Sequence, residues 1–199
     1  SYNIMSFGNM KKENGQNPIL NYIKNSNADI VCMQEYAGSE TAKIHLSNKE
    51  IRQALKDYPY HNIKQVGKTG AGSQLACYSK FPILSARMLD YRSNYNGSMV
   101  YEIKIGKDTV LLINNHLESN KLTREDKVVY EDMLKDPKAG KVKSGVRQLV
   151  NKLAEASAIR SAQARTIAQE IAHSPYPSVI VCGDFNDSPI SYAVFCLKK

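Results

Sequence analysis

Hydrophobic residues along the chain form two patterns, short continuous runs and positions at helical spacing. The continuous runs at 28–33 and 178–182 are short and β-rich, which is typical of strands buried on both faces. Further strands are predicted at 1–7, 60–66, 75–78, 85–89, 99–105, 109–114 and 193–199.

Apolar residues at helical spacing predict helices between these strands. Asn17-Pro18 begins a short helix, because proline is favoured in the first turn. Ser47-Asn48-Lys49-Glu50 is a capping-box pattern and predicts a second helix directly after it. Residues 123–134 predict a third helix. The apolar positions from Val142 to Ile171 predict one long helix or two consecutive ones, ended before Pro175.

Strands in neighbouring stretches of sequence, with helices between them, predict an α/β sandwich of layered sheets. The chain has 199 residues, 42% hydrophobic and 23% charged, which is typical of one globular domain over 1–199. No apolar run approaches the ~20 residues of a membrane span, and no secretory signal pattern opens the chain. The compartment is left open by these observations.

Charge and cysteine content narrow the function only slightly. The 27 Lys and Arg residues outnumber the 19 Asp and Glu residues, so the formal net charge is +8. This charge fits an anionic partner, such as nucleic acid, a phosphorylated metabolite or a lipid headgroup, and it equally fits a solubilising surface. The four cysteines show no CxxC spacing, so we expect free thiols and no zinc site.

Polar residues follow several predicted buried strands and are the candidates for chemistry. Glu35, His116 and Asp184 with Asn186 each follow a strand, and Asn3 lies within the first one. If these strand ends converge, they bring carboxylates, an imidazole and carboxamides together, a set that binds a hard divalent cation and positions a water beside a phosphoryl group. Each residue also has a plain structural interpretation: a surface residue or helix cap, a structural histidine, or an Asx turn.

The combination of these segments resembles the endonuclease/exonuclease/phosphatase superfamily, which has the DNase-I-like fold. The similar segments occur in order at 2–4, 29–35, 78–83, 114–117 and 183–187. Gln34-Glu35 after an apolar strand and Gly183-Asp184-Phe185-Asn186 are the most specific of them. The resemblance implies a four-layer α/β/β/α sandwich, an α/β (α+β) fold, and phosphoester hydrolysis dependent on Mg²⁺ or Mn²⁺.

The resemblance also implies a role for each candidate residue. Glu35 would ligate the metal, and Asn3 would help to hold the metal–phosphate region. His116 would donate a hydrogen bond to a phosphate oxygen. Asp184 would orient or activate the attacking water, and Asn186 would position it, which makes His116, Asp184 and Asn186 the candidate catalytic residues.

One feature of the family pattern is absent from the sequence. The family carries an Asp-His motif shortly before its last strand, and none of the four histidines here follows an aspartate. Either a segment near 190–195 is omitted from the sequence, or the protein has lost this base. We favour omission, because a final strand at 193–199 would have no partner strand. The chain also opens inside a predicted strand, so we expect a trimmed N-terminus, as in similar bacterial proteins with an N-terminal membrane region.

The leading hypothesis is therefore a divalent-metal-dependent hydrolase of phosphoester bonds, either a phosphodiesterase or nuclease, or a phosphatase. Its substrate would be nucleic acid, a lipid headgroup or a small phosphate ester, and we expect a monomer without a protein partner. The alternative is a catalytically dead module that binds phosphate or nucleic acid. A third, weaker alternative is an α/β interaction domain whose strand-end residues form turns. The charged stretch 118–143, with Lys121 and Arg124, is predicted to shape substrate choice, unless it is a solvated surface helix.

Overall fold

A computed structural model describes residues 1–9, 16–38, 46–67, 74–91, 93–135 and 142–197. Residues 136–141 of the charged stretch lie outside this part of the chain. In the described residues the strands form two four-stranded sheets. The first sheet has the order β1 (Tyr2–Asn3), β2 (Ile30–Tyr36), β4 (Gln74–Ser79), β3 (Tyr60–Gln65). The second has the order β5 (Ile83–Met88), β6 (Gly97–Ile105), β7 (Asp108–His116), β8 (Val179–Asp184).

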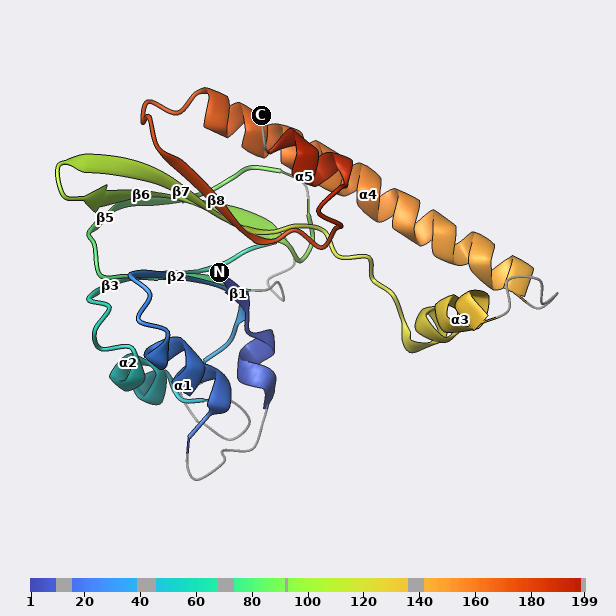
Figure 1. Cartoon of the computed structure of the whole chain (residues 1–199), viewed down its shortest axis with the longest axis horizontal. Helices are drawn as coiled ribbons and strands as arrows, with labels where there is room; N and C mark the ends of the chain where they lie inside the picture. Colours follow the sequence, from blue (N-terminus) through green and yellow to red (C-terminus); the bar gives the residue numbers. More distant parts are fainter. Residues whose placement is uncertain (10–15, 39–45, 68–73, 92, 136–141, 198–199) are drawn as a thin grey trace.

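The two sheets face each other and helices cover their outer faces, as Figure 1 shows. Helices α1 (Pro18–Asn25) and α2 (Asn48–Ala54) lie outside the first sheet. Helices α4 (Val142–Ala172) and α5 (Tyr192–Cys196) lie outside the second. The prediction of a four-layer α/β/β/α sandwich is therefore confirmed.

Apolar side chains fill the spaces between the four layers. Between the sheets lie Cys32, Leu75 and Cys77 from the first and Met99, Tyr101, Ile103 and Leu112 from the second. A second cluster packs β2 and β4 against α1 and α2, and a third packs β6 and β7 against α4. Both faces of β2 are thus buried, which explains its continuous apolar run. The prediction that the run at 178–182 is buried on both faces is wrong, because β8 lies at the edge of its sheet in the described residues and Ile180 is 45% exposed.

Pairing direction decides where the strand ends lie. Most neighbouring strands are antiparallel, but β1 pairs with β2 in parallel, and β7 pairs with β8 in parallel. The register places Asn3 beside Gln34 and His116 beside Asp184. The carboxyl ends of these four strands therefore meet at one edge of the sandwich.

Both ends of the chain differ from the sequence-based expectation. The predicted strand at 1–7 ends at Asn3, and the chain then turns through Met5–Gly8, a segment whose φ angles are all positive, from 43° to 73°. The predicted strand at 193–199 is wrong, because residues Tyr192–Cys196 form helix α5. Ser191 caps this helix by accepting a hydrogen bond from the Val194 amide, and Ala193 is buried with 1% exposure. The argument for an omitted segment near 190–195 depended on a final strand without a partner, and this strand is not present. The omission itself stays a prediction.

The long apolar stripe forms one helix, α4, of 31 residues. Its first part and helix α3 (Arg124–Lys135) extend beyond the sheets, as Figure 1 shows. In the described part of the chain, no helix has both the length and the apolar character needed to cross a membrane.

Candidate active site

Four of the five candidate residues form one cluster where the two sheets meet. The Asn3 amide donates from Nδ2 to Glu35 Oε1 at 3.0 Å and to Asp184 Oδ2 at 2.8 Å. His116 Nε2 lies 3.7 Å from Glu35 Oε1 and 4.0 Å from Asp184 Oδ2. Asn3 and Glu35 come from the first sheet, whereas His116 and Asp184 come from the second. The two carboxylates therefore accept hydrogen bonds from the same amide nitrogen, and both lie beside one imidazole.

A β-bulge directs Glu35 towards this cluster. Along β2 and β4, Met33 pairs with Ala76 and Tyr36 pairs with Gln74, so β2 carries one extra residue between these pairs. A bulge of this kind re-aims the side chain that it contains. The backbone of Glu35 lies in the left-handed region, with φ of 52°. This conformation is costly for a residue with a side chain, and such strain concentrates at functional sites.

The Gly-Asp-Phe-Asn motif positions Asp184 through two backbone features. Gly183 has φ of +137°, and a Cβ at this position would lie 2.1 Å from the carbonyl oxygen of Asn115. Only glycine therefore allows β8 to approach β7 here. Asn186 donates from its backbone N–H to Asp184 Oδ1 at 2.9 Å, so the Asx turn considered from the sequence is present. The turn fixes Oδ1 while Oδ2 accepts from Asn3.

Asn186 joins the cluster through the strand that carries His116. Its amide donates from Nδ2 to the carbonyl oxygen of Leu117 at 2.8 Å, directly after His116. Its backbone is also left-handed, with φ of 51°. Asn186, Glu35 and His116 line one pocket of about 480 Å³. Asn3 and Asp184 are not among the lining residues of this pocket; Asn3 contacts Glu35, and Asp184 contacts His116, at its wall.

Several pocket residues gave no signal in the sequence. They come from loops and strand ends with no apolar pattern: Ser6, Gln74, Tyr95, Asn96 and Ser119. Ser119 follows His116 closely, and nearness to a candidate residue was the one available clue. Tyr95 and Asn96 precede β6, and they reach the pocket because Gly97 pairs with His116 across the antiparallel ladder. Only this long-range pairing places them there.

His116 is buried, with 5% of its surface exposed. This burial lowers its pKa below 6.5, although Asp184, Glu35 and Glu118 oppose the shift. The imidazole is therefore neutral at pH 7. Its Nδ1 is buried and has no hydrogen-bond partner in the described part of the structure. A neutral ring with its proton on Nε2 presents a hydrogen-bond donor to the cluster.

Other polar residues of the same motifs have structural roles beneath the site. Gln34 donates from Nε2 to Asn114 Oδ1 at 2.6 Å, which joins the two sheets across their core. Asn114 in turn donates to the carbonyl oxygens of Met33 and Ala76. Asn115 donates to the carbonyl oxygen of Cys182 at 2.8 Å and so ties β7 to β8. These hydrogen bonds hold in place the strand ends that carry the cluster.

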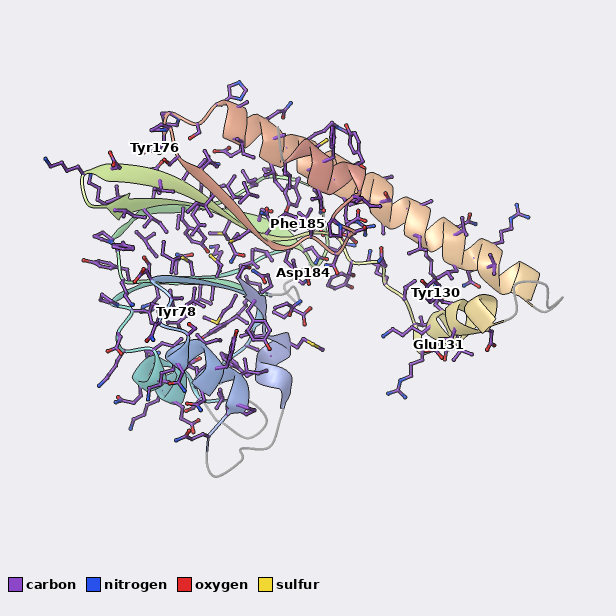
Figure 2. All side chains as sticks on the ribbon, viewed as in Figure 1. Tyr78, Tyr130, Glu131, Tyr176, Asp184 and Phe185 are labelled. Atoms are coloured by element: carbon purple, nitrogen blue, oxygen red, sulfur yellow. The ribbon has the colours of Figure 1, made fainter. Side chains whose placement is uncertain are left out.

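The charged stretch after His116 contributes little to the pocket. Of its described residues, only Ser119 lines the pocket. Lys121 pairs with Glu118 at 2.6 Å. Figure 2 shows Tyr130 and Glu131 of α3 far from Asp184. Helix α3 therefore does not overhang the cluster, and an effect of Lys121 or Arg124 on substrate choice stays a prediction.

The fold and the cluster define a class of protein: an α/β sandwich with carboxylate, imidazole and carboxamide groups at the meeting edge of two sheets. The model of the Endonuclease/Exonuclease/phosphatase family matches residues 1–195, and the chain belongs to this family. The resemblance inferred from the sequence motifs is thereby confirmed. Membership of this family supports phosphoester hydrolysis as the general class of activity.

Solved structures with the same fold include TDP2 proteins and a sphingomyelinase C. Truncated TDP2 from Caenorhabditis elegans is 20% identical with a TM-score of 0.55, and the match covers 94% of this chain and 61% of that one. TDP2 from D. rerio, complexed with a single-strand DNA product, is 16% identical with a TM-score of 0.57, covering 94% and 59%. Sphingomyelinase C from Streptomyces griseocarneus is 19% identical with a TM-score of 0.56, covering 86% and 56%.

The chain thus spans about three-fifths of the length of these proteins. At these identities the likeness shows the fold alone. No curated protein sequence matches the chain significantly.

Proposed function

We propose that the protein is a divalent-metal-dependent hydrolase of phosphoester bonds, with Mg²⁺ or Mn²⁺ as the metal. The observation that carries the proposal is the single Asn3 amide bonded to the carboxylates of both Glu35 and Asp184, with His116 beside them. Two carboxylates this close repel each other, and a positive group beside them would relieve that repulsion. A hard cation bound at Glu35 would supply this charge.

The donor set fits such a cation. In the described residues, no group of three or more His, Cys, Asp or Glu side chains is arranged to hold a metal by itself. Mg²⁺ is usually bound through one or two carboxylates, with water and substrate phosphate completing its shell. Glu35 matches this mode as the metal ligand, and Asp184 lies beside it. The cation, when bound, neutralises charge on the phosphoryl oxygens and makes a bound water more acidic.

The remaining chemistry is assigned to side chains of the cluster. His116, neutral and with Nε2 facing the carboxylates, would donate a hydrogen bond to a phosphate oxygen as negative charge develops there. Asp184 would accept a proton from the attacking water or orient it, and Asn186 would position that water. Asn3 would keep Glu35 and Asp184 at a fixed spacing.

The substrate is proposed by class. The net charge of +8 favours a polyanion. Among the solved structures with this fold, one TDP2 is complexed with a single-strand DNA product, and another protein is a sphingomyelinase C. We therefore propose a phosphodiester, in nucleic acid or in a lipid headgroup. The alternative function is a module that binds phosphate without cleaving it, which the missing Asp-His motif favours.

Hydrolysis of a substrate panel with Mg²⁺, Mn²⁺ or EDTA tests the proposal. The panel contains plasmid DNA, abasic DNA, phosphoinositides, sphingomyelin and a nitrophenyl phosphodiester. Glu35→Gln and Asp184→Asn should abolish any metal-dependent activity, whereas the exposed control Asp57→Asn should retain it. Activity that survives both substitutions would contradict the assigned roles. Binding without cleavage in all metal conditions would favour the alternative.

A further inference from the structure

Two polar residues are buried on the face of α4 that packs against the second sheet. Arg160 is 3% exposed and Gln163 is 1% exposed. Their positions, three apart on a helix, place both side chains on one face. Neither residue lines the active-site pocket. Burying the charged guanidinium of Arg160 costs free energy unless hydrogen bonds compensate it. The partners of these hydrogen bonds therefore indicate the role of the residue.

Arg160 bonds to two loops at once. Its Nε donates to Asp187 Oδ2 at 2.9 Å, in the loop after β8. Its Nη1 donates to the carbonyl oxygen of Glu118 at 3.0 Å and to Asn120 Oδ1 at 2.8 Å, in the loop after β7. Gln163 supports the second loop, since its Oε1 accepts a hydrogen bond from the Glu118 amide at 2.9 Å.

These loops begin at the candidate active site. Glu118 lies two residues after His116, and Asp187 lies one residue after Asn186. Closer to the strands, the Leu117 amide donates to the carbonyl oxygen of Asp184 at 2.9 Å, and Asn186 donates to the carbonyl oxygen of Leu117. Arg160 therefore joins the two chain segments that follow β7 and β8, beyond the point where the strands themselves pair.

The side of the pocket formed by Asn96 is connected to the loop after β7. The Glu118 carboxylate, itself 3% exposed, accepts a hydrogen bond from Ser93 Oγ at 2.7 Å. Ser93 Oγ accepts in turn from the backbone amide of Asn96, which lines the pocket. A shift of the Glu118 loop would thus move the His116 side of the pocket and the Asn96 side together.

We propose that Arg160 is a positioning residue that fixes the spacing between the loop that follows His116 and the loop that carries Asn186. An apolar residue would hold α4 on the sheet without the cost of burying a charge. A planar guanidinium is needed because its donors point in fixed directions and satisfy acceptors on both loops. A lysine, with one flexible ammonium group, cannot reproduce this arrangement. The catalytic consequence of the spacing rests on the proposed function.

The test compares Arg160→Lys, which keeps the charge, with Asp187→Ala, which removes one partner and leaves the arginine in place. Arg165→Lys is the matched control, because Arg165 is exposed on the same helix. Hydrogen–deuterium exchange is measured on peptides covering 111–120 and, as a reference, 97–105. Steady-state hydrolysis of a nitrophenyl phosphodiester gives kcat and KM separately.

We expect both variants to exchange faster at 111–120 but not at 97–105, and kcat to fall by about 10- to 100-fold with little change in KM. The control should behave like the wild type. Exchange at 111–120 equal to that of the control, or a uniform rise over both peptides, would overturn the proposal. If the wild-type chain hydrolyses nothing, the proposed function fails, whereas the exchange result still decides whether Arg160 fixes the loops.

Discussion

The hydrogen bonds of Asn3 make its replacement by alanine the most informative perturbation of the site. Asn3→Ala removes the donor shared by Glu35 and Asp184, and it also removes the Asn3 Oδ1 acceptor of the Met5 amide at 3.1 Å. The two carboxylates then face each other without compensation. The metal-free variant should be less stable than the wild type.

The size of the effect follows from the exposure of these groups. A hydrogen bond to a charged group contributes about 1.5–3 kcal/mol when well buried. The Glu35 and Asp184 side chains are 39% and 29% exposed, so solvent weakens both bonds. We expect a total loss of about 2 kcal/mol. For a domain of this size, that loss lowers Tm by roughly 4–8 °C.

Thermal unfolding in EDTA and in Mg²⁺ measures this effect. The Tm difference between Asn3→Ala and wild type should be largest in EDTA, and it should narrow in Mg²⁺, because a bound cation compensates the same carboxylates. Asn151→Ala, at an exposed position on α4, is the control and should leave Tm unchanged. An Asn3→Ala variant with the wild-type Tm in EDTA would refute the roles given to the cluster.

Three further predictions concern the motifs and the core. Gly183→Ala should lower the free energy of unfolding by at least about 3 kcal/mol in urea titrations, because the added Cβ meets the Asn115 backbone. The control Gly106→Ala should cost only about 1 kcal/mol, because Gly106 has φ of +60° but no atom within 4 Å of an added Cβ. Equal losses in the two variants would contradict a steric cause. Burial lowers the pKa of His116 below its unfolded value of 6.5, so the unfolded chain takes up a proton first as the pH falls. The free energy of unfolding of the metal-free protein should therefore drop as the pH falls below about 6.5. In urea titrations His116→Gln should reduce that drop, whereas the control His173→Gln should not. Parallel pH curves for wild type and His116→Gln would exclude this cause. Tyr36→Phe should cost about 1 kcal/mol by the same measurement, because it breaks the buried hydroxyl pair of Tyr36 and Tyr78, whereas Tyr22→Phe at a 68% exposed position should be neutral.

Local signals in the sequence were sufficient for most elements. The capping box at Ser47 and Glu50 is present, with both reciprocal hydrogen bonds, and α1 begins at Pro18 as predicted. The apolar runs at 28–33 and 178–182 correspond closely to β2 and β8. These signals work because caps and buried strands depend on residues close together in the chain.

The sequence was less informative where a pattern fits two structures. Residues 193–199 contain closely spaced apolar side chains that suit a strand or a short helix. The Ser191 cap and the burial of Ala193 where α5 packs against α4 select the helix. The opening strand likewise ends at Asn3, because the chain turns there to place its carboxamide between Glu35 and Asp184.

By itself, the sequence determined the layered α/β class and the residue types that follow the strands. Only the tertiary structure decided that Asn3 bridges two sheets, that a bulge turns Glu35 towards His116, and that Arg160 joins two loops from a helix. Element type follows from neighbours a few positions apart, whereas these contacts join residues far apart in the sequence. Pairing direction and register between strands set them, and no local pattern specifies either.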